Sequence, residues 1–208
     1  MVKTPLLLIG GGGHCRSCID VIEATQEYEI VGIVEADGAQ PDDTMAYPVM
    51  GFDSDLPVLI EQTPHCFLTI GQVKNSQIRQ TLFDRLKALG AILPTVISPT
   101  AYVSPTARVG EGSIVMHQSM VNAYAQIGDN CILNSQSLVE HDSVIANHCH
   151  ISTGTKINGQ VSIGEGCMLG SNSVIKQSVD IADNSIIGAG SVVLNSINKA
   201  VIYTGLVK

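Results

Sequence analysis

A six-residue period runs through the second half of the chain and constrains its fold more than any other feature of the sequence. Stepping by six from Ile97, every position as far as Val193 is isoleucine, valine or leucine. These residues make up roughly a quarter of an ordinary composition, so chance does not produce such a run. A second rule holds two residues earlier in each repeat, where the side chains from Ala101 to Ser191 are small or β-branched.

This period predicts a left-handed parallel β-helix. Residues two apart lie on the same face of an extended strand, so the aliphatic and small side chains of each repeat point into one interior. Six residues suffice for a short strand and a two-residue corner, and three such strands complete a triangular coil. At ~4.8 Å between stacked strands, residues 97–193 build a prism roughly 25 Å long. Cys131, Cys149 and Cys167 are spaced by eighteen and are therefore expected to stack as core thiols.

The first part of the chain predicts a small α/β domain with a short Rossmann-like parallel sheet. Buried strands alternate with amphipathic helices there, and this order places a ligand at the carboxyl ends of the strands. Strands are expected within residues 5–9, 29–37 and 65–71, and helices within 13–26 and 75–90.

The proline-containing segment from Pro94 to Pro105 joins the two parts. It predicts a nucleotide-type α/β domain over residues 1–94 and a β-helix domain over residues 95–208. Because this linker is short, we expect the two domains to be fixed relative to each other.

A glycine loop at residues 10–14, GGGGH, favours a phosphate bound at a helix N-terminus. The dinucleotide pattern G-x-G-x-x-G fits poorly, because Cys15 or Arg16 falls at its last glycine. The alternative is a tight strand-to-helix turn without a ligand. Glu35 and Asp37 follow the second strand, where an acid can hold a ribose hydroxyl or a base edge, although turn residues have the same appearance.

Composition excludes several classes of partner. The net charge of −8 and the isoelectric point near 5.0 argue against nucleic acid and against an anionic membrane surface. The sequence contains no run of eighteen apolar residues, so it predicts no transmembrane helix. The N-terminus reads as a strand rather than a signal peptide, which predicts a cytoplasmic protein with free cysteines.

Three of the six histidines lie close together in the β-helix. The register places His141 and Asp142 at one corner, His148 at the next corner and His150 on a strand, all pointing outward. Gly159 follows one coil after His141 and leaves a shallow gap beside it. A threefold ring of prisms would turn such corners into clefts, where His141 could act as a general base with Asp142 fixing its tautomer. A plain polar turn and a zinc site shared between subunits are the alternatives.

The joint pattern GGGGH, TIGQ at 69–72, VEHD at 139–142 and SIGEGCMLGSNSVI at 162–175 resembles the bacterial nucleotide-sugar N-acetyltransferases. This family includes the enzymes that acetylate UDP-4-amino-4,6-dideoxy-N-acetylhexosamines and the sialic acid O-acetyltransferase relatives. The resemblance covers nearly the whole chain. It implies acetyl transfer from acetyl-CoA to the 4-amino group of such a sugar for surface glycan biosynthesis, without a metal, by a homotrimer with active sites between protomers. The choice between UDP and GDP stays open.

The resemblance also implies roles for single residues. His141 matches the catalytic base that takes a proton from the sugar amine, and Asp142 matches the acid that orients it. One departure is Val207, which stands where relatives commonly have proline near the coenzyme. The other implied contacts are His150 with the acetyl-CoA thioester, Gly159, Gly170 and Ser171 with coenzyme A, Asn134 with the sugar, Gly13 and His14 with the phosphates, and Glu35, Asp37 and Gly71 with or near the base.

Three other functions remain compatible with the residues. The same machinery could acetylate a sugar hydroxyl, as in the sialic acid type. A metal-dependent hydratase of the solenoid type is a second possibility, and a non-catalytic nucleotide-sugar-binding protein is a third.

Overall fold

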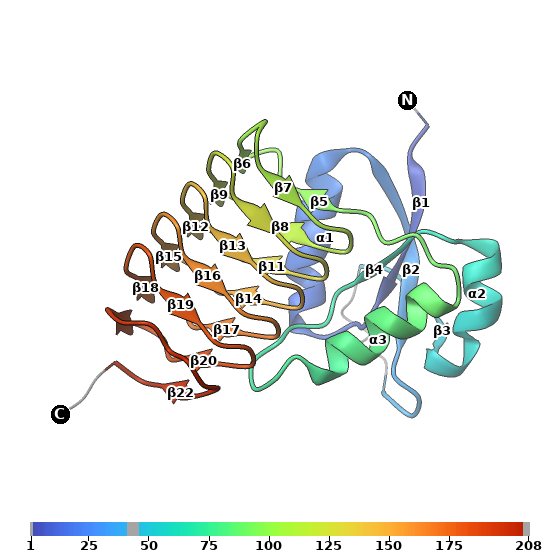
Figure 1. Cartoon of the computed structure of the whole chain (residues 1–208). Helices are drawn as coiled ribbons and strands as arrows, with labels where there is room; N and C mark the ends of the chain where they lie inside the picture. Colours follow the sequence, from blue (N-terminus) through green and yellow to red (C-terminus); the bar gives the residue numbers. More distant parts are fainter. Residues whose placement is uncertain (1, 41–45, 206–208) are drawn as a thin grey trace.

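Two parts of different architecture lie side by side in the computed structural model, which describes residues 2–40 and 46–205 (Figure 1). A triangular prism of parallel strands stands next to a small α/β sheet, and its last coils extend away from that sheet. No helix within the described ranges is long and apolar enough to cross a membrane. Val207 lies outside the described residues.

The α/β part is a parallel sheet with the strand order β3-β2-β1-β4. The three predicted strands and both predicted helices are present, but the sequence reasoning missed a fourth strand and a short helix. The missed strand has no fully buried residue, and the missed helix is only seven residues long, so neither carries a clear hydrophobic period. The elements are β1 (Thr4–Ile9), α1 (Gly13–Thr25), β2 (Tyr28–Glu35), β3 (Val49–Phe52), the 3-10 turn η1 (Asp53–Asp55), α2 (Leu56–Gln62), β4 (Cys66–Leu68) and α3 (Gln77–Ala88).

The prism is a left-handed parallel β-helix, as the six-residue period predicts. Its two-residue strands form three parallel sheets, and paired residues are eighteen apart, as in Leu133 and Ile151, except in the last pair, where Ile186 lies beside Ile202. The seven-stranded sheet contains β5 (Val96–Ile97), β8 (Ile114–Val115), β11 (Ile132–Leu133), β14 (His150–Ile151), β17 (Met168–Leu169), β20 (Ile186–Ile187) and β22 (Ile202–Tyr203). The six-stranded sheet contains β6 (Tyr102–Val103), β9 (Met120–Val121), β12 (Leu138–Val139), β15 (Lys156–Ile157), β18 (Val174–Ile175) and β21 (Val192–Val193). The five-stranded sheet contains β7 (Arg108–Val109), β10 (Gln126–Ile127), β13 (Val144–Ile145), β16 (Ser162–Ile163) and β19 (Asp180–Ile181).

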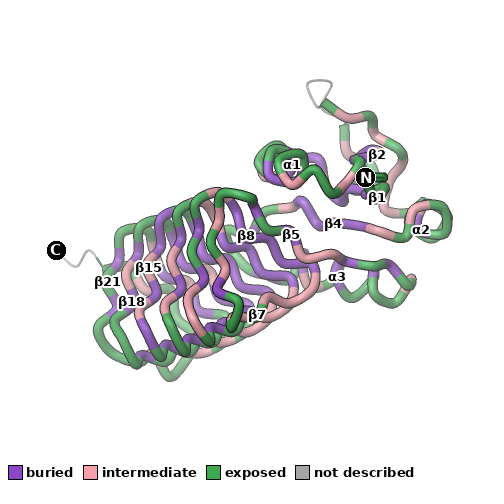
Figure 2. Tube along the Cα trace, turned by 90° about the horizontal axis from the view of Figure 1, so that it is seen from above, coloured by how far each residue is buried: buried purple, intermediate pink, exposed green. Residues whose placement is uncertain are grey.

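The predicted inward positions form the core of the prism, which appears as buried stripes along its length (Figure 2). Cys131, Cys149 and Cys167 are fully buried free thiols within it, as predicted. Ile97 pairs with the inward Val115, as the register predicts, but it is 39% exposed. This residue lies in the first coil, where no coil beneath covers the interior.

A left-handed backbone conformation recurs at the second corner residue of each repeat. From Gly112 to Gly190, every sixth residue has a φ between 54° and 71°. This conformation costs an ordinary L-residue energy and is easiest for glycine, asparagine and aspartate. Asp142 occupies one of these positions with a φ of 60°. The solenoid therefore dictates the direction in which this carboxylate leaves the backbone.

The α/β part packs on the outer face of the seven-stranded sheet. Leu6 and Leu8 of β1 share one apolar cluster with Ile114 and Ile132 of the prism. Beside this cluster lies Arg79 of α3, which is only 2% exposed.

The guanidinium of Arg79 joins the two parts directly. It donates to the carbonyl of Ile70 and to the side-chain oxygen of Asn130, both at 2.5 Å. Its Nε has no hydrogen-bond partner among the described residues, so the bonds of the two terminal nitrogens compensate for burying the charge. This interface therefore holds the two parts in one relative position.

A pair of alanine variants in β16 tests the alternation of inward and outward residues. Ile163→Ala removes a buried side chain from the prism and is expected to lower the free energy of unfolding by about 2–5 kcal/mol, because it leaves a cavity. The neighbouring Ser162→Ala, on the exposed side of the same strand, is expected to change it by less than about 0.5 kcal/mol. Chemical denaturation measures both, and equal effects would contradict the assigned register.

Candidate functional site

The residues predicted to carry function lie in three separate places. The first is a pocket in the α/β part. The second is the near edge of the prism, where the chain turns from the seven-stranded to the six-stranded sheet. The third is the far edge, between the six-stranded and five-stranded sheets and opposite the face that the α/β part covers. The α/β part holds Gly13, His14, Glu35, Asp37 and Gly71, of which Glu35 lines the pocket and His14 lies close to His150; the near edge holds Asn134, His150, Gly170 and Ser171, and the far edge His141, Asp142 and Gly159.

At the far edge, His141 and Asp142 form a hydrogen-bonded pair. His141 Nδ1 lies 2.8 Å from Asp142 Oδ2, and the two side chains are 50% and 51% exposed. Because a carboxylate only accepts, this bond assigns the proton to Nδ1 and leaves the lone pair on Nε2. The pair has the geometry of an oriented general base.

Gly159 makes room for the His141 ring. A Cβ atom built on Gly159 would lie 2.7 Å from both Cε1 and Nε2 of His141. Any larger residue would therefore displace the imidazole. The gap that the sequence predicts beside His141 is filled by the histidine's own ring.

His150 on β14 points away from the prism interior, as the register predicts, but it is not open to solvent. The α/β part covers it and leaves it 7% exposed. Its Nδ1 donates to the carbonyl of Gln72 at 2.6 Å, so Nε2 is the acceptor and faces the amide of Asn134 at 3.4 Å. Burial lowers the pKa of His150, which favours its neutral form.

His148 is likewise covered, and only His141 of the three is exposed. His148 is 9% exposed and lies edge-on to Phe83 of α3, with 5.5 Å between ring centroids. Its Nδ1 is 2.9 Å from the side-chain amide of Asn130. This histidine therefore belongs to the contact between α3 and the prism.

His14 follows Gly13 at the start of α1, beside Gly71. Its ring centroid is 6.4 Å from that of His150. Burial, followed by the nearby charges of Arg79 and His150, lowers the pKa of His14 to about 4. Its Nε2 is a buried atom without a hydrogen-bond partner among the described residues. Such an atom is costly to bury unless a ligand supplies the missing partner.

A pocket of about 420 Å³ lies at the carboxyl ends of β1 and β2, beside α3. The glycine loop forms one side of it, where the Gly11 amide donates to Glu35 Oε2 at 3.1 Å. Asp37 does not line this pocket. Its carboxylate instead accepts the amide hydrogen of Ser54 at 3.1 Å.

Two charged residues that the sequence reasoning missed also line this pocket. They are Asp53, which follows β3 directly, and Arg85 of α3, whose Nη2 donates to the Asp53 carbonyl at 2.7 Å. Partial burial raises the pKa of Asp53, with smaller contributions from neighbouring charges. Asp53 could have been found only by predicting β3, because acids at strand ends line such pockets.

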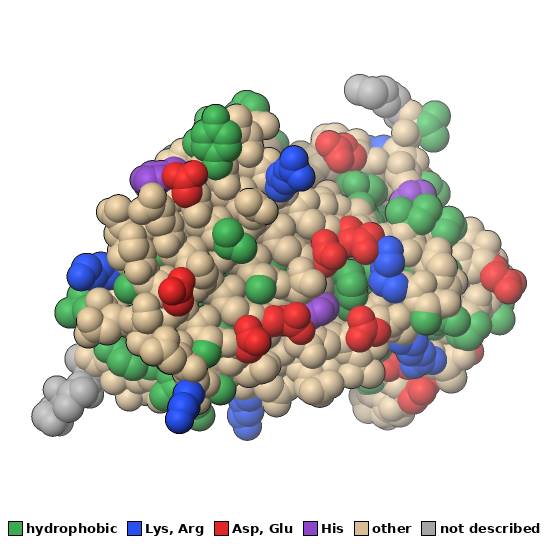
Figure 3. Space-filling view, in the orientation of Figure 1, with side chains coloured by type: hydrophobic (Ala, Val, Ile, Leu, Met, Phe, Trp, Pro, Cys, Tyr) green, Lys and Arg blue, Asp and Glu red, His purple; other side chains and the backbone are tan. Residues whose placement is uncertain are grey.

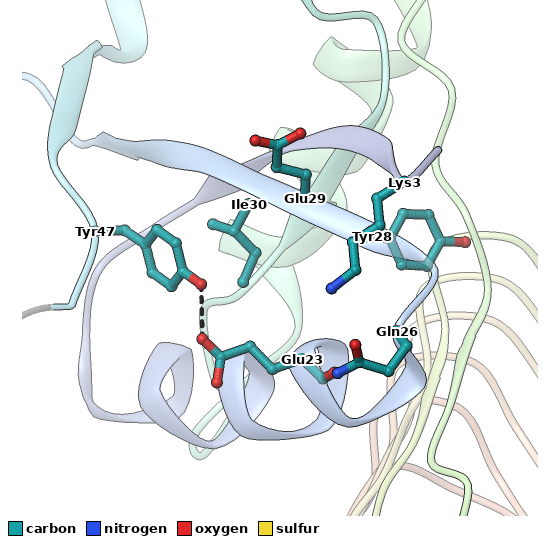
Figure 4. A pocket seen from close by; sticks show the side chains of 7 residues that line it. All are labelled: Lys3, Glu23, Gln26, Tyr28, Glu29, Ile30 and Tyr47. Carbon is teal, nitrogen blue, oxygen red and sulfur yellow. Dashed lines mark hydrogen bonds between the residues drawn. The ribbon is translucent and has the colours of Figure 1, made fainter. Parts of the chain in front are cut away.

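A second hollow, of about 530 Å³, lies at the other end of the same sheet (Figure 4). Tyr47 donates to Glu23 there at 2.6 Å, and this bond raises the pKa of Tyr47 to about 12. The hollow is larger, but it lies beside the start of β2 and the end of α1. Ligands of parallel α/β sheets bind at the opposite, carboxyl edge, so the smaller pocket is the better candidate. The lining residues are Lys3, Glu23, Gln26, Tyr28, Glu29, Ile30 and Tyr47.

Two further predicted residues lie along the near edge. A Cβ on Gly170 would approach the Ala189 amide nitrogen to 2.5 Å, so the stacking of coils requires glycine there, whereas Ser171 is exposed. Over the described ranges, no three histidine, cysteine or acidic side chains are grouped so that they could hold a metal ion. Acidic side chains outnumber basic ones on the face in Figure 3, in line with the net charge of −8.

Comparison with known families matches both parts of the chain. Residues 5–86 match the family described as PglD N-terminal domain, and residues 160–195 match the hexapeptide repeat of succinyl-transferase. No match was found among curated protein sequences.

Several solved structures are similar over nearly the whole chain. PerB from Caulobacter crescentus, solved with CoA and GDP-perosamine, is 35% identical with a TM-score of 0.86, covering 94% of this chain and 91% of that one. The acetyltransferase domain of PglB from Neisseria gonorrhoeae, solved with acetyl coenzyme A, is 31% identical with a TM-score of 0.85, covering 94% and 93%. WeeI from Acinetobacter baumannii, at 19% identity and a TM-score of 0.59 with 94% and 93% covered, shares the fold.

The low pKa of His14 predicts an acid-sensitive contribution to stability. An unfolded histidine titrates near 6.5 and folded His14 near 4, so the unfolded state binds more protons between these values. This contribution is complete above pH 6.5 and is lost as the pH falls toward 4. We expect His14→Gln to lose less unfolding free energy than the parent protein between pH 7.5 and pH 5, measured by chemical denaturation. Equal losses in the two proteins would contradict this.

Proposed function

The chain belongs to the hexapeptide-repeat family of nucleotide-sugar N-acetyltransferases, and we propose that it acetylates the 4-amino group of a nucleotide-linked amino-deoxy sugar. Acetyl-CoA is the acetyl donor of this family. The observation that carries the proposed mechanism is the His141–Asp142 pair, half-exposed at the far edge with Nε2 free to accept a proton. The cytoplasmic location of the protein and its part in surface glycan biosynthesis stay predictions.

The chemistry needs one well-placed base. Bound acetyl-CoA supplies a thioester whose thiolate leaves without strong acid assistance. As the sugar amine forms its bond to the acetyl carbon and the carbon–sulfur bond breaks, His141 Nε2 takes a proton from the amine nitrogen. Asp142 keeps the other ring nitrogen protonated and stabilises the imidazolium that forms. A general base of this kind contributes roughly 10²–10⁴ in rate.

The substrate contacts follow the polar groups around the pocket and the near edge. The start of α1 at Gly13 offers backbone amides to the diphosphate, and neutral His14 offers the unpartnered Nε2. Glu35 lies beside the glycine loop, where an acid binds the ribose. Gly71, on the loop that faces His14, borders the same path.

Sugar and coenzyme contacts are proposed along the prism edges. Asn134 faces the sugar, and His150, whose Nε2 lies next to it, is placed near the thioester by the family resemblance. Coenzyme A is proposed to run past Gly170 and the exposed hydroxyl of Ser171, and to meet Gly159 beside His141.

We propose a homotrimer because the two halves of the site lie on opposite sides of one protomer. The α/β part covers the seven-stranded sheet, whereas His141 lies at the far edge, away from that sheet. A neighbouring prism would bring the far edge of one chain to the pocket of another. The outer row of the six-stranded sheet supports such a contact, since Tyr102, Met120 and Val192 are apolar and 52%, 42% and 48% exposed.

Replacing the base tests the mechanism. His141→Ala is expected to lower kcat/KM for acetyl transfer by at least about 10², with thermal stability retained. The matched control is His117→Ala, which removes another corner histidine, bound to Asp20, and is expected to keep activity within about threefold. Retention of more than about a tenth of kcat/KM in His141→Ala would overturn the assignment. Faster transfer to a 4-hydroxy sugar than to the 4-amino sugar would support O-acetylation instead.

Mixed assemblies test whether the site is shared between protomers. His141→Ala and His14→Ala are each expected to be inactive alone. Refolded together, they are expected to recover about a quarter of the parent activity, because that fraction of interfaces pairs an intact His141 with an intact His14 of its neighbour. Recovery close to zero would place both residues in the site of one protomer.

A further inference from the structure

The pocket in the α/β part carries one acid more than a ribose requires. Glu35 is tied to the glycine loop through Gly11, which is the position of a ribose-binding acid. Asp53 lines the same pocket from η1. Among the described residues, no donor forms a hydrogen bond with its carboxylate.

The backbone around Asp53 is held from three sides. Arg85 donates to the Asp53 carbonyl at 2.7 Å, and Asp37 accepts from the Ser54 amide at 3.1 Å. The Asp55 carboxylate accepts from the amide of Phe52 at 2.9 Å. The Asp53 carboxylate is thus a free acceptor on a fixed backbone, which is the arrangement of a preorganised recognition group.

The rest of the pocket suits a flat aromatic ring. Ile70 of the loop after β4 and Ile78 and Leu82 of α3 give it apolar walls, and Arg85 adds a cation at its rim. These four residues and Asp53 are among those that line the pocket of about 420 Å³. A nucleobase can lie against the apolar walls while its polar edge meets Asp53 and Arg85.

The two charged groups match one base better than the others. Guanine presents two adjacent donors, N1–H and the N2 amino group, to the two oxygens of a carboxylate, and its O6 and N7 accept from arginine. Uracil offers a single N–H between two carbonyl oxygens, so the second carboxylate oxygen faces a like partial charge. Adenine and cytosine place an acceptor where guanine has N1–H.

We infer that this protein selects a guanine nucleotide, and that Asp53 reads the N1–H and N2 amino edge of the base. This inference rests on the proposed function, because it assumes that the pocket holds the nucleotide of the sugar substrate. It assigns a specificity role to Asp53 and leaves the acetyl-transfer chemistry at His141 unchanged.

A ligand series tests the selection without any variant. GDP, IDP and UDP are titrated into the full chain by isothermal calorimetry. IDP differs from GDP only in lacking the N2 amino group. We expect GDP to bind at least about tenfold more tightly than either, since a hydrogen bond to a charged group contributes at least that much. UDP or IDP binding as tightly as GDP would overturn the inference.

A variant then tests the residue. Asp53→Ala is expected to bring the GDP and IDP dissociation constants to within about twofold of each other, because both nucleotides lose the same carboxylate. The matched control Asp84→Ala removes an exposed acid of α3 outside the pocket lining and is expected to keep the tenfold ratio. An unchanged ratio in Asp53→Ala would remove Asp53 from base recognition.

The outcomes separate this inference from the proposed function. Efficient acetylation of a UDP-linked amino sugar, with UDP bound more tightly than GDP, would leave the proposed function in place and overturn the guanine selection. Tight, Asp53-dependent GDP binding without acetyl transfer to any GDP-linked amino sugar would support the guanine selection and overturn the proposed function.

Discussion

The buried guanidinium of Arg79 is the interaction on which the arrangement of the rest depends. It comes from α3, donates to the carbonyl of Ile70 at the end of the α/β sheet, and reaches Asn130 at a corner of the prism. A charge at 2% exposure is tolerated only when it is hydrogen-bonded, and both terminal nitrogens of Arg79 find acceptors at this interface, so Arg79 favours one relative position of the two parts. Its charge also contributes to the low pKa values of His14 and His150.

The loop that follows Ile70 connects the α/β part to the near edge of the prism. The Gln72 carbonyl accepts from His150 Nδ1, which fixes the tautomer of that ring and turns Nε2 toward Asn134. Gly71 of the same loop lies against His14. One short segment therefore sets the geometry of groups that come from both parts of the chain.

The prism supplies rigidity of a different kind. Its corners repeat one backbone conformation, so His141 and Asp142 are held by the same geometry that builds every coil. Gly159, one coil later, leaves the space that the His141 ring fills. Because the α/β part covers the face opposite this edge, His141 and the α/β pocket of a single chain lie on opposite sides. This opposition supports the proposed site between protomers.

The sequence by itself determined the features that depend on which way a side chain points from its own strand. A six-residue period reports which side chains point inward, so the β-helix, the buried stack of Cys131, Cys149 and Cys167, and the corner position of His141 could all be predicted. The period could not report what lies against the outside of the prism.

Only the tertiary structure decided the contacts between segments that are distant along the chain. His150 and His148 are buried because the α/β part covers outward positions, and Arg79 meets Asn130 across fifty-one residues of sequence separation. Asp53 reaches the pocket through β3, a strand without a clear hydrophobic pattern, whereas the Asp37 carboxylate accepts the amide hydrogen of Ser54. A periodic pattern encodes the orientation of each side chain in its own strand, whereas burial at an interface depends on which other surface packs against it.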